Sequence, residues 1–473
     1  MSDAKRIRDD LTRELGADRL VHDDAAIARR ARDSWVISIW REMQKASSRA
    51  ACVVQPTTTE EVATILRYAA GARLPIVPFG LGSGVCGAIQ PEPNAIVLDL
   101  GAMHRLLRID EVSLLATVQP GMMGSDFEAA LNDAGYSMGH FPQSIGVSSV
   151  GGWVATRAAG QFSTRYGNIE DMLVAFEAVL PSGEIVRTRP TPRGATGQDI
   201  RHLFLGAEGT TGVLTELTFQ IHPQPESTRC QAIAFPSMDA GLTALRLIMR
   251  AGWRPPVLRL YDEIEATRTY ADAVQTDESL LLVVTEGPES MTRTELDAVE
   301  TICVQAGGRT IGAKPVEDWL GHRNTVPSFE SFLEQGVIVD TIEVAVTWDR
   351  IGDLYTEVLA GMRAVPGLIV ASGHSSHSYA TGTNIYFTFA ARPERKEEIE
   401  TTYFDVWRAA MEATLATGGT VSHHHGIGRV RRDWLARELG TAYPLLGLVK
   451  NALDPLGIMN PGALLPESDR PAR

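Results

Sequence analysis

The segment from Pro78 to Gly87 restricts the fold more than any other part of the chain, because four of its ten residues are glycine. Such a loop can turn successive backbone N–H groups towards a phosphate. Residues 82–87 also match the G-x-G-x-x-G pattern of Rossmann folds, which require a helix directly after the loop. A proline-punctuated stretch and an apolar strand pattern over residues 95–100 follow instead. The sequence therefore excludes a Rossmann site and favours a phosphate cradle between two strands, with an ordinary glycine-rich turn as the alternative.

The length of 473 residues and the hydrophobic content of 44% predict a large core divided among two or three domains. Residues 1–50 are predicted to form a peripheral N-terminal helical arm, with charged helices over residues 4–15 and 25–34. Residues 51–224 are predicted to form an α+β domain, because strand patterns (52–56 and 74–78) alternate with a helix that is capped by threonines (59–72).

Longer helices and strands are predicted for a second domain over residues 225–417. Its elements are expected at residues 240–251, 290–306, 341–346 and 384–390. The C-terminal segment, residues 418–473, contains a predicted helix around 441–453 and ends in a stretch punctuated by proline and glycine.

Charge and cysteine content exclude several classes of partner. A formal net charge of -14 argues against binding to nucleic acid or to anionic membranes. The four cysteines lie far apart without a C-x-x-C pair, so neither a disulfide framework nor a structural zinc site is expected, and a cytoplasmic location is predicted. The apolar runs are too short to cross a bilayer, and the chain is expected to lack a signal peptide and a peroxisomal ending of the Ser-Lys-Leu type.

Three consecutive histidines, His423, His424 and His425, stand between glycines in the C-terminal segment. Imidazoles exchange protons near neutral pH, and tight glycine turns let a backbone approach a ligand. We therefore interpret the run as an acid/base site, with a surface histidine cluster as the alternative. Further stretches of small residues, at 141–171 and 206–215, could bring backbone amides and hydroxyls against a flat, polar ligand.

Together these segments resemble the vanillyl-alcohol-oxidase family of FAD flavoproteins over roughly residues 50–465. The resemblance implies an α+β fold, in which a PCMH-type FAD-binding domain of two subdomains (51–224) joins a substrate-binding cap with an antiparallel sheet and flanking helices (225–417). It also implies that residues 418–473 pack back on the FAD domain. Within the family, Val150 to Ala158, Trp348 to Arg350 and the histidine run resemble alkyldihydroxyacetonephosphate synthase, whereas the Asn460-Pro461-Gly462 ending also resembles the D-lactate, glycolate and D-2-hydroxyglutarate dehydrogenases.

The resemblance implies a set of FAD-binding residues. They are Pro78, Gly80, Gly82, Ser83, Gly84, Val85, Cys86, Gly87, Pro142, Ser144, Ser148, Ser149, Gly151, Gly152, Thr156, Ala158, Gly160, Tyr166, Glu208, Gly209, Gly212, Val213 and Asn460. Non-covalent attachment is expected, because the loop has no histidine where covalent relatives attach FAD. Cys86 is interpreted as a buried thiol.

The implied catalytic residues are His423, His424, His425, Tyr386 and Arg259. Arg259 matches an arginine that binds the substrate phosphate in the synthases; the alternative is a solvated charge paired with Asp262. No bound metal is expected, because His424 stands where the metal-using dehydrogenases have a glutamate and Tyr386 where they have a histidine. A set formed by His374, His377 and His424 is the metal alternative. Arg323 lies near, but out of register with, a basic residue of the synthases.

The expected function is FAD-dependent oxidation of a 2-hydroxy acid or related small alcohol that bears an anionic group. A histidine would take the hydroxyl proton and flavin N5 the hydride. The alternative within the family is exchange of an acyl for an alkyl group through a covalent flavin–substrate adduct, as in the synthase. A cofactor-free anion-binding protein is a third possibility. The expected partners are a small anionic substrate, an unidentified electron acceptor and a second copy of the chain.

Overall fold

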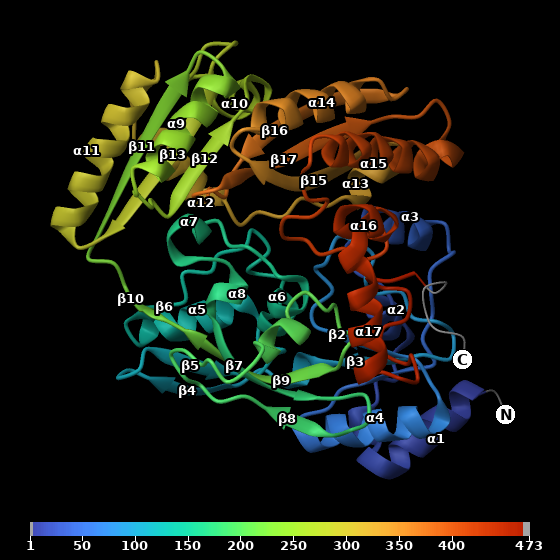
Figure 1. The fold of residues 1–473 in the computed structure, drawn as a ribbon. Coiled ribbons are helices and arrows are strands. Elements are labelled where there is room, and N and C mark those ends of the chain that lie inside the picture. Colours follow the sequence, from blue (N-terminus) through green and yellow to red (C-terminus); the bar gives the residue numbers. More distant parts are fainter. Residues whose placement is uncertain (1–2, 467–473) are drawn as a thin grey trace.

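The computed structural model describes residues 3–466 (Figure 1). The expectations about both extreme ends of the chain, including the missing peroxisomal ending, concern residues outside this range. None of the described helices is both long and apolar enough to cross a membrane.

Two larger sheets and one two-stranded sheet build the part of the chain that carries the glycine loop. The first is a parallel sheet in the order β1 (Cys52–Val54), β3 (Ile96–Asp99), β2 (Ile76–Phe79), against which α4 (Thr59–Ala72) and α1 (Asp3–Leu15) pack. The second is antiparallel, in the order β4 (Leu106–Asp110), β5 (Leu115–Val118), β9 (Val213–Gln220), β7 (Leu173–Val179), β8 (Ile185–Arg187). Its helices are α5 (Gly124–Asp133), α6 (Val150–Thr156), α7 (Ser163–Tyr166) and α8 (Ile169–Met172), and β6 (Tyr136–Ser137) pairs with β10 (His222–Pro223).

The glycine loop joins the parallel strands β2 and β3 without an intervening helix. This arrangement agrees with the strand, loop and strand order expected from the sequence.

The cap is one antiparallel sheet of seven strands. Their order is β14 (Arg309–Gly312), β11 (Ser227–Phe235), β13 (Ser279–Gly287), β12 (Val257–Tyr261), β16 (Leu368–Ser375), β17 (Gly382–Ala391), β15 (Ile338–Thr347). Figure 1 shows long helices along the outer side of this sheet: α9 (Met238–Arg250), α11 (Glu289–Gln305), α14 (Ile351–Arg363) and α15 (Ile399–Ala416). Shorter helices complete the cap: α10 (Glu263–Tyr270), α12 (Lys314–His322) and α13 (Glu330–Glu334).

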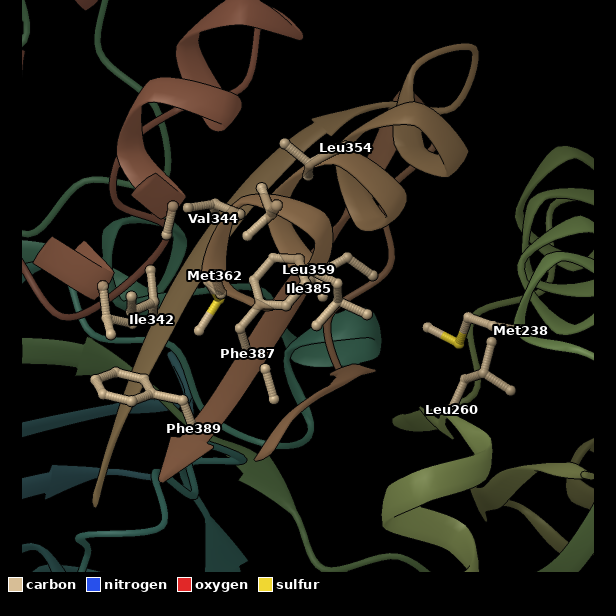
Figure 2. Close-up of a cluster of buried hydrophobic side chains, with 14 of the residues drawn as sticks. Met238, Leu260, Ile342, Val344, Leu354, Leu359, Met362, Ile385, Phe387 and Phe389 are labelled. Atoms are coloured by element: carbon tan, nitrogen blue, oxygen red, sulfur yellow. The ribbon is translucent and has the colours of Figure 1, made fainter. Parts of the chain in front are cut away.

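Every second side chain of β15 and β17 packs into the apolar cap core, as Figure 2 shows for Phe387 and Phe389 beside Ile342 and Val344. All four are fully buried. Because side chains alternate across a strand, the intervening residues of β15 and β17 face the opposite side of the sheet. That side is turned towards the FAD-binding part of the chain.

The N-terminal segment is helical but not peripheral, which corrects the expectation for residues 1–50. Besides α1 it contains α2 (Asp24–Arg29) and α3 (Val36–Met43). Trp35 and most of α3 belong to the cap core, and Trp35 Nε1 donates a 2.8 Å hydrogen bond to the Tyr403 hydroxyl on α15. The contact removes the apolar side chains of Trp35 and α3 from water, and full burial of one large apolar side chain contributes about 1.5–3 kcal/mol to stability.

The C-terminal segment returns to the FAD-binding part through α16 (Arg432–Leu439) and α17 (Tyr443–Leu453). Met459 forms a parallel bridge with Ile76 of β2, and Asn460 Nδ2 donates a 2.7 Å hydrogen bond to the Glu208 carbonyl.

Candidate active site

A cavity of about 600 Å³ lies between the FAD-binding part and the inner face of the cap sheet. This volume falls within the range of cofactor and substrate sites. Its wall includes the glycine loop, the loops around Ser148 and Glu208, the strands β12, β16, β17 and β15, and the histidine run.

Strand register explains why distant polar residues meet in this wall. Tyr261 is paired with His374, His374 with Tyr386, and Tyr386 with Glu343. Cross-strand partners point to the same face of a sheet, so these four side chains form one row, which Arg259 joins two residues before Tyr261. The cap sheet thereby presents a row of polar side chains to the cavity, while its opposite face packs against the apolar cap core.

Arg259 is held within the cavity wall rather than paired with Asp262. Its Nε donates a 2.7 Å hydrogen bond to the Tyr261 hydroxyl, and its Nη2 lies 2.7 Å from His374 Nε2. The Asp262 carboxylate instead caps α10 and accepts from the Gly373 amide and the Tyr355 hydroxyl. The solvated-charge interpretation of Arg259 is therefore wrong.

His374 is fixed in one neutral tautomer by its neighbours. Because arginine can only donate, His374 Nε2 accepts from Arg259, and its Nδ1–H donates to Glu265 Oε2 at 2.7 Å. Burial and the Arg259 charge lower the pKa of His374 below its ordinary value. Both ring nitrogens are thus engaged, so the metal set that included His374 does not form.

Glu343 is the buried anchor of the histidine run. Its fully buried carboxylate forms an ion pair with Arg431, accepts from the His425 amide at 3.0 Å and lies 2.9 Å from His425 Nδ1, off the line of an ideal hydrogen bond. Burial alone would raise the pKa of Glu343, but the Arg431 charge outweighs it and holds that pKa well below its ordinary range. The negative carboxylate therefore orients His425 with Nδ1 inward and leaves Nε2 for the cavity.

His423 and His424 are linked to each other instead. Their Nδ1 atoms lie 2.7 Å apart, and His423 Nε2 lies 2.7 Å from the Tyr379 hydroxyl. Burial lowers the pKa of His423 to about 4 and that of His424 well below its ordinary value, so both rings are neutral near pH 7.

His377 lies against this pair with its Nε2 buried and without a protein partner in the part of the chain that the structure describes. One ring nitrogen each from His377, His423 and His424 fall within 4.8 Å of one another, close enough to surround a metal ion. The His423 and His424 rings are also in direct contact through their Nδ1 atoms.

Tyr386 stands beside the run, with its ring 5.7 Å from that of His425 and 6.0 Å from that of His424. Its hydroxyl oxygen accepts from Thr341 Oγ1 at 2.9 Å, so its own proton remains available to a ligand. Burial raises the pKa of Tyr386, which keeps the hydroxyl protonated.

The glycine loop in the cavity wall fits a dinucleotide phosphate. Gly82, Ser83 and Gly84 line the cavity, and within residues 3–466 their three N–H groups have no protein acceptor. Three consecutive open donors make the kind of concave nest that binds anions. At Gly80 a Cβ would lie 2.3 Å from Ser149 Oγ, so only glycine lets the loop approach the α6 N-terminus.

Most residues expected to bind FAD line this one cavity. They are Pro78, Gly80, Gly82, Ser83, Gly84, Val85, Pro142, Ser144, Ser148, Ser149, Gly151, Gly152, Thr156, Ala158, Glu208, Gly209, Gly212, Val213 and Asn460. Of the expected catalytic residues, Arg259, Tyr386, His424 and His425 line it as well, whereas His423 lies behind His424.

Four expected FAD-binding residues lie outside the cavity wall and have structural contacts instead. The buried Cys86 carbonyl accepts from the Arg429 amide, and a Cβ on Gly87 would collide with the Trp35 ring. Gly160 allows close approach to the Phe141 amide, and the Tyr166 hydroxyl donates to Glu286 of the cap. Small residues near a ligand loop and small residues in tight packing look alike in a sequence.

Several residues of the site were missed. Asp33 lines the cavity and accepts from the Ala88 amide at 2.9 Å, and burial raises its pKa to about 6. It sits in a charged run, so no signal marks it. Glu343 could have been found, because a glutamate inside the otherwise apolar stretch 341–346 needs a partner when buried.

Two family models match the chain, "FAD binding domain" at residues 50–189 and "FAD linked oxidases, C-terminal domain" at residues 224–464. The chain is 33% identical to the "Uncharacterized FAD-linked oxidoreductase YgcU" of Escherichia coli K12, over 97% of this chain and 98% of that protein. It is 31% identical to alkyldihydroxyacetonephosphate synthase of Trypanosoma brucei brucei (88% and 73% covered) and 26% identical to glycolate oxidase subunit GlcD of Bacillus subtilis (88% and 89%).

A solved structure of an alkyldihydroxyacetonephosphate synthase superimposes with a TM-score of 0.80 at 25% identity, covering 97% of this chain and 84% of that one. The chain belongs to the FAD-linked oxidases of the vanillyl-alcohol-oxidase and PCMH type, which confirms the expected family, fold class and enzyme class.

Proposed function

We propose that this FAD-linked oxidoreductase oxidises a small alcohol bearing an anionic group, a 2-hydroxy acid being the simplest case. The observation that carries the proposal is that Arg259 and His425 line the same cavity from one face of the cap sheet and its adjoining loop. One group can hold an anion and the other can take a proton. FAD, bound non-covalently along Gly82 to Gly84, would accept the hydride from the substrate carbon.

Arg259 binds the substrate carboxylate or phosphate, because its guanidinium is a permanent cation with a rigid set of donors. Tyr386 donates its free hydroxyl proton to the reacting oxygen and orients it. His425 takes the hydroxyl proton on Nε2, while the Glu343 carboxylate beside Nδ1 stabilises the imidazolium that forms.

Alkyl transfer is the second candidate, supported by the similarity to the synthases and by Tyr386 standing beside the histidine run. In that reaction His425 would remove a carbon-bound proton and Arg259 would bind the phosphate of the substrate.

Anaerobic mixing separates the two. The FAD-loaded protein should lose the visible absorption of oxidised flavin on addition of a 2-hydroxy acid such as glycolate, D-lactate or D-2-hydroxyglutarate. Release of a fatty acid from an acyl dihydroxyacetone phosphate, with no bleaching by any hydroxy acid, would establish alkyl transfer instead. A homodimer and a cytoplasmic location remain predictions.

A further inference from the structure

The histidine run contains a continuous chain of hydrogen-bonding groups that leads away from the cavity. His424 lines the cavity, and its Nδ1 lies 2.7 Å from Nδ1 of His423. His423 Nε2 lies 2.7 Å from the Tyr379 hydroxyl. The Tyr379 hydroxyl also accepts from Asn168 Nδ2 at 2.9 Å.

The outer end of this chain lies where the cap meets the surface of the FAD-binding part. Asn168 caps α8, and close by Arg157, whose side chain is 51% exposed, forms a 2.8 Å ion pair with Glu170. Tyr379 itself is half-buried, held in the β16–β17 hairpin by a 2.9 Å bond from its amide to the Gly382 carbonyl. The chain therefore runs from the cavity wall to the half-buried Tyr379, at the edge where the cap meets the FAD-binding part.

Each member of the chain can donate and accept a hydrogen bond. A phenol does both through one oxygen, and a neutral imidazole accepts at one nitrogen and donates at the other. Between two neutral rings, a contact of 2.7 Å joining Nδ1 to Nδ1 requires one nitrogen to donate and the other to accept, so the tautomers of His423 and His424 are coupled. A proton that enters at one end can thus leave at the other by a shift of one hydrogen at each link.

We propose that His424, His423 and Tyr379 form a proton relay between the cavity and the surface. The proposal rests on the proposed oxidation, in which the substrate O–H bond breaks, the C=O bond forms and one proton is released within the cavity in each turnover. His425 holds that proton first, and its ring centroid lies 4.4 Å from that of His424, the entrance to the relay. Nothing is oxidised or reduced in the relay, since one proton leaves as another is displaced.

This role also explains why three histidines stand in sequence. His425 is engaged by Glu343, so it can act as a base, but it is not part of the hydrogen-bond chain from His424 to Tyr379. His423 does not line the cavity, so it cannot act on a substrate directly. Its position between His424 and Tyr379 is that of an intermediate link.

The test replaces Tyr379 with phenylalanine, which removes the hydroxyl and keeps the ring. Tyr68→Phe is the matched control, because its hydroxyl also bonds a neighbour, Asp10 Oδ2 at 3.0 Å, between α4 and α1. The first measurement is nitrogen NMR of the resting FAD-loaded protein labelled with ¹⁵N-histidine, which reports which ring nitrogens carry protons and how fast they exchange with water.

In the native protein one Nδ1 of the His423 and His424 pair should be protonated and the other unprotonated. Tyr379→Phe should shift both rings and slow their exchange about 10-fold or more, whereas Tyr68→Phe should leave them unchanged. Ring signals and exchange rates that are unaffected by Tyr379→Phe would overturn the relay. Stoichiometric zinc bound to His377, His423 and His424 would overturn it too, because the metal would occupy the nitrogen lone pairs.

The second measurement is turnover in H₂O and D₂O. Tyr379→Phe should lower kcat about 10-fold and increase the solvent isotope effect, with the KM unchanged. This loss of kcat is smaller than the 10²–10⁴-fold expected when an acid/base group is removed, because a water molecule can slowly replace the missing hydroxyl. If the histidine rings are coupled but hydroxy acids do not reduce the flavin, the relay is retained and the proposed oxidation is rejected. If hydroxy acids reduce the flavin but Tyr379→Phe leaves turnover unchanged, the oxidation is retained and the relay is rejected.

Discussion

Three chemically identical side chains in a row acquire three different environments. His425 faces a buried carboxylate, His424 faces the cavity and its neighbour, and His423 faces a tyrosine hydroxyl. The differences come from residues far away in the chain, Glu343 and Tyr379, that the cap sheet carries to this loop. Substitutions at the three positions should therefore have unequal effects.

Replacing His425 with glutamine should lower turnover about 10²–10⁴-fold, because the base next to Glu343 is lost. FAD content should be unchanged, since the phosphate nest consists of backbone amides of residues 82–84 and does not include His425. Absorbance spectra and steady-state rates test both points, with the exposed His104→Gln as the control. Loss of FAD together with activity would show instead that the run is a structural turn.

Arg259→Ala should raise the KM for an anionic substrate about 10-fold or more, in line with the 1.5–3 kcal/mol that a hydrogen bond to a charged group contributes. The KM for an uncharged amide analogue of the same substrate should change little. Equal effects on both substrates would assign Arg259 to the support of His374 rather than to anion binding.

His140 provides a pH-dependent test. It is buried without a hydrogen-bond partner among residues 3–466, and burial lowers its pKa from 6.5 to about 3. The folded protein keeps it neutral while the unfolded chain protonates it below pH 6.5, so its contribution to stability is lost as the pH falls.

The stability of His140→Phe relative to the native protein should therefore increase by about 2 kcal/mol between pH 6.5 and pH 5, at about 1.4 kcal/mol per pH unit. Urea unfolding at both pH values measures the difference. A gap that does not change with pH would show that His140 titrates normally.

At the scale of elements, local signals predicted local structure well. The helix expected over residues 59–72 is α4 with the same bounds, because the Thr58 side chain accepts from the Glu61 amide and two glutamates follow in the first turn. The predicted strands 341–346 and 384–390 lie within β15 and β17. What could not be predicted is their register, and the register is what aligns Tyr386 with His374 and Glu343.

The burial of α3 was missed for a related reason. Its neighbours Tyr403 and Glu400 are more than 350 residues away in sequence, so no local pattern reveals them. Most residues of the candidate site could be named from glycine-rich motifs, whereas partners such as Asp33, Glu265 and Tyr379 depend on tertiary contacts that a single sequence does not display.

Gly428 lies where the histidine segment contacts the glycine loop. A Cβ there would lie 2.1 Å from the Cys86 carbonyl oxygen, and its φ of +54° is in the left-handed region. Its amide also donates to the Glu208 carboxylate. Gly428→Ala should therefore separate the histidine segment from the glycine loop and reduce FAD loading. It should also lower the free energy of unfolding, by about 1–3 kcal/mol from overpacking alone.

Gly418→Ala is the control, because Gly418 has a φ of +79° but no atom within 4 Å of the position that a Cβ would take. It should show only the cost of backbone strain. Thermal unfolding and flavin content of the two variants distinguish a steric collision with Cys86 from backbone strain. Equal losses of stability and flavin in both variants would rule out the collision.

At the scale of the whole molecule, the cavity lies between the FAD-binding part and the cap sheet. A ligand that fills it contacts both, so FAD should stabilise the assembled chain by linkage. Saturation at 100 times the dissociation constant corresponds to about 2.7 kcal/mol. Removing FAD should lower the melting temperature, and adding FAD should restore it.

Because attachment is proposed to be non-covalent, acid precipitation should leave the yellow colour in the supernatant. Colour retained in the pellet would indicate a covalent bond, for which Cys86 is the residue to examine.

The packing of Trp35 on Tyr403 also has a consequence for biosynthesis. The helix that follows Trp35 emerges early, but its docking surface on α15 is made 368 residues later. At 5–20 residues per second, a ribosome needs roughly 20–70 s to supply it. During that interval the apolar segment with Trp35 and Trp40 lacks its docking surface, so we expect it to be exposed to chaperones until α15 has been made.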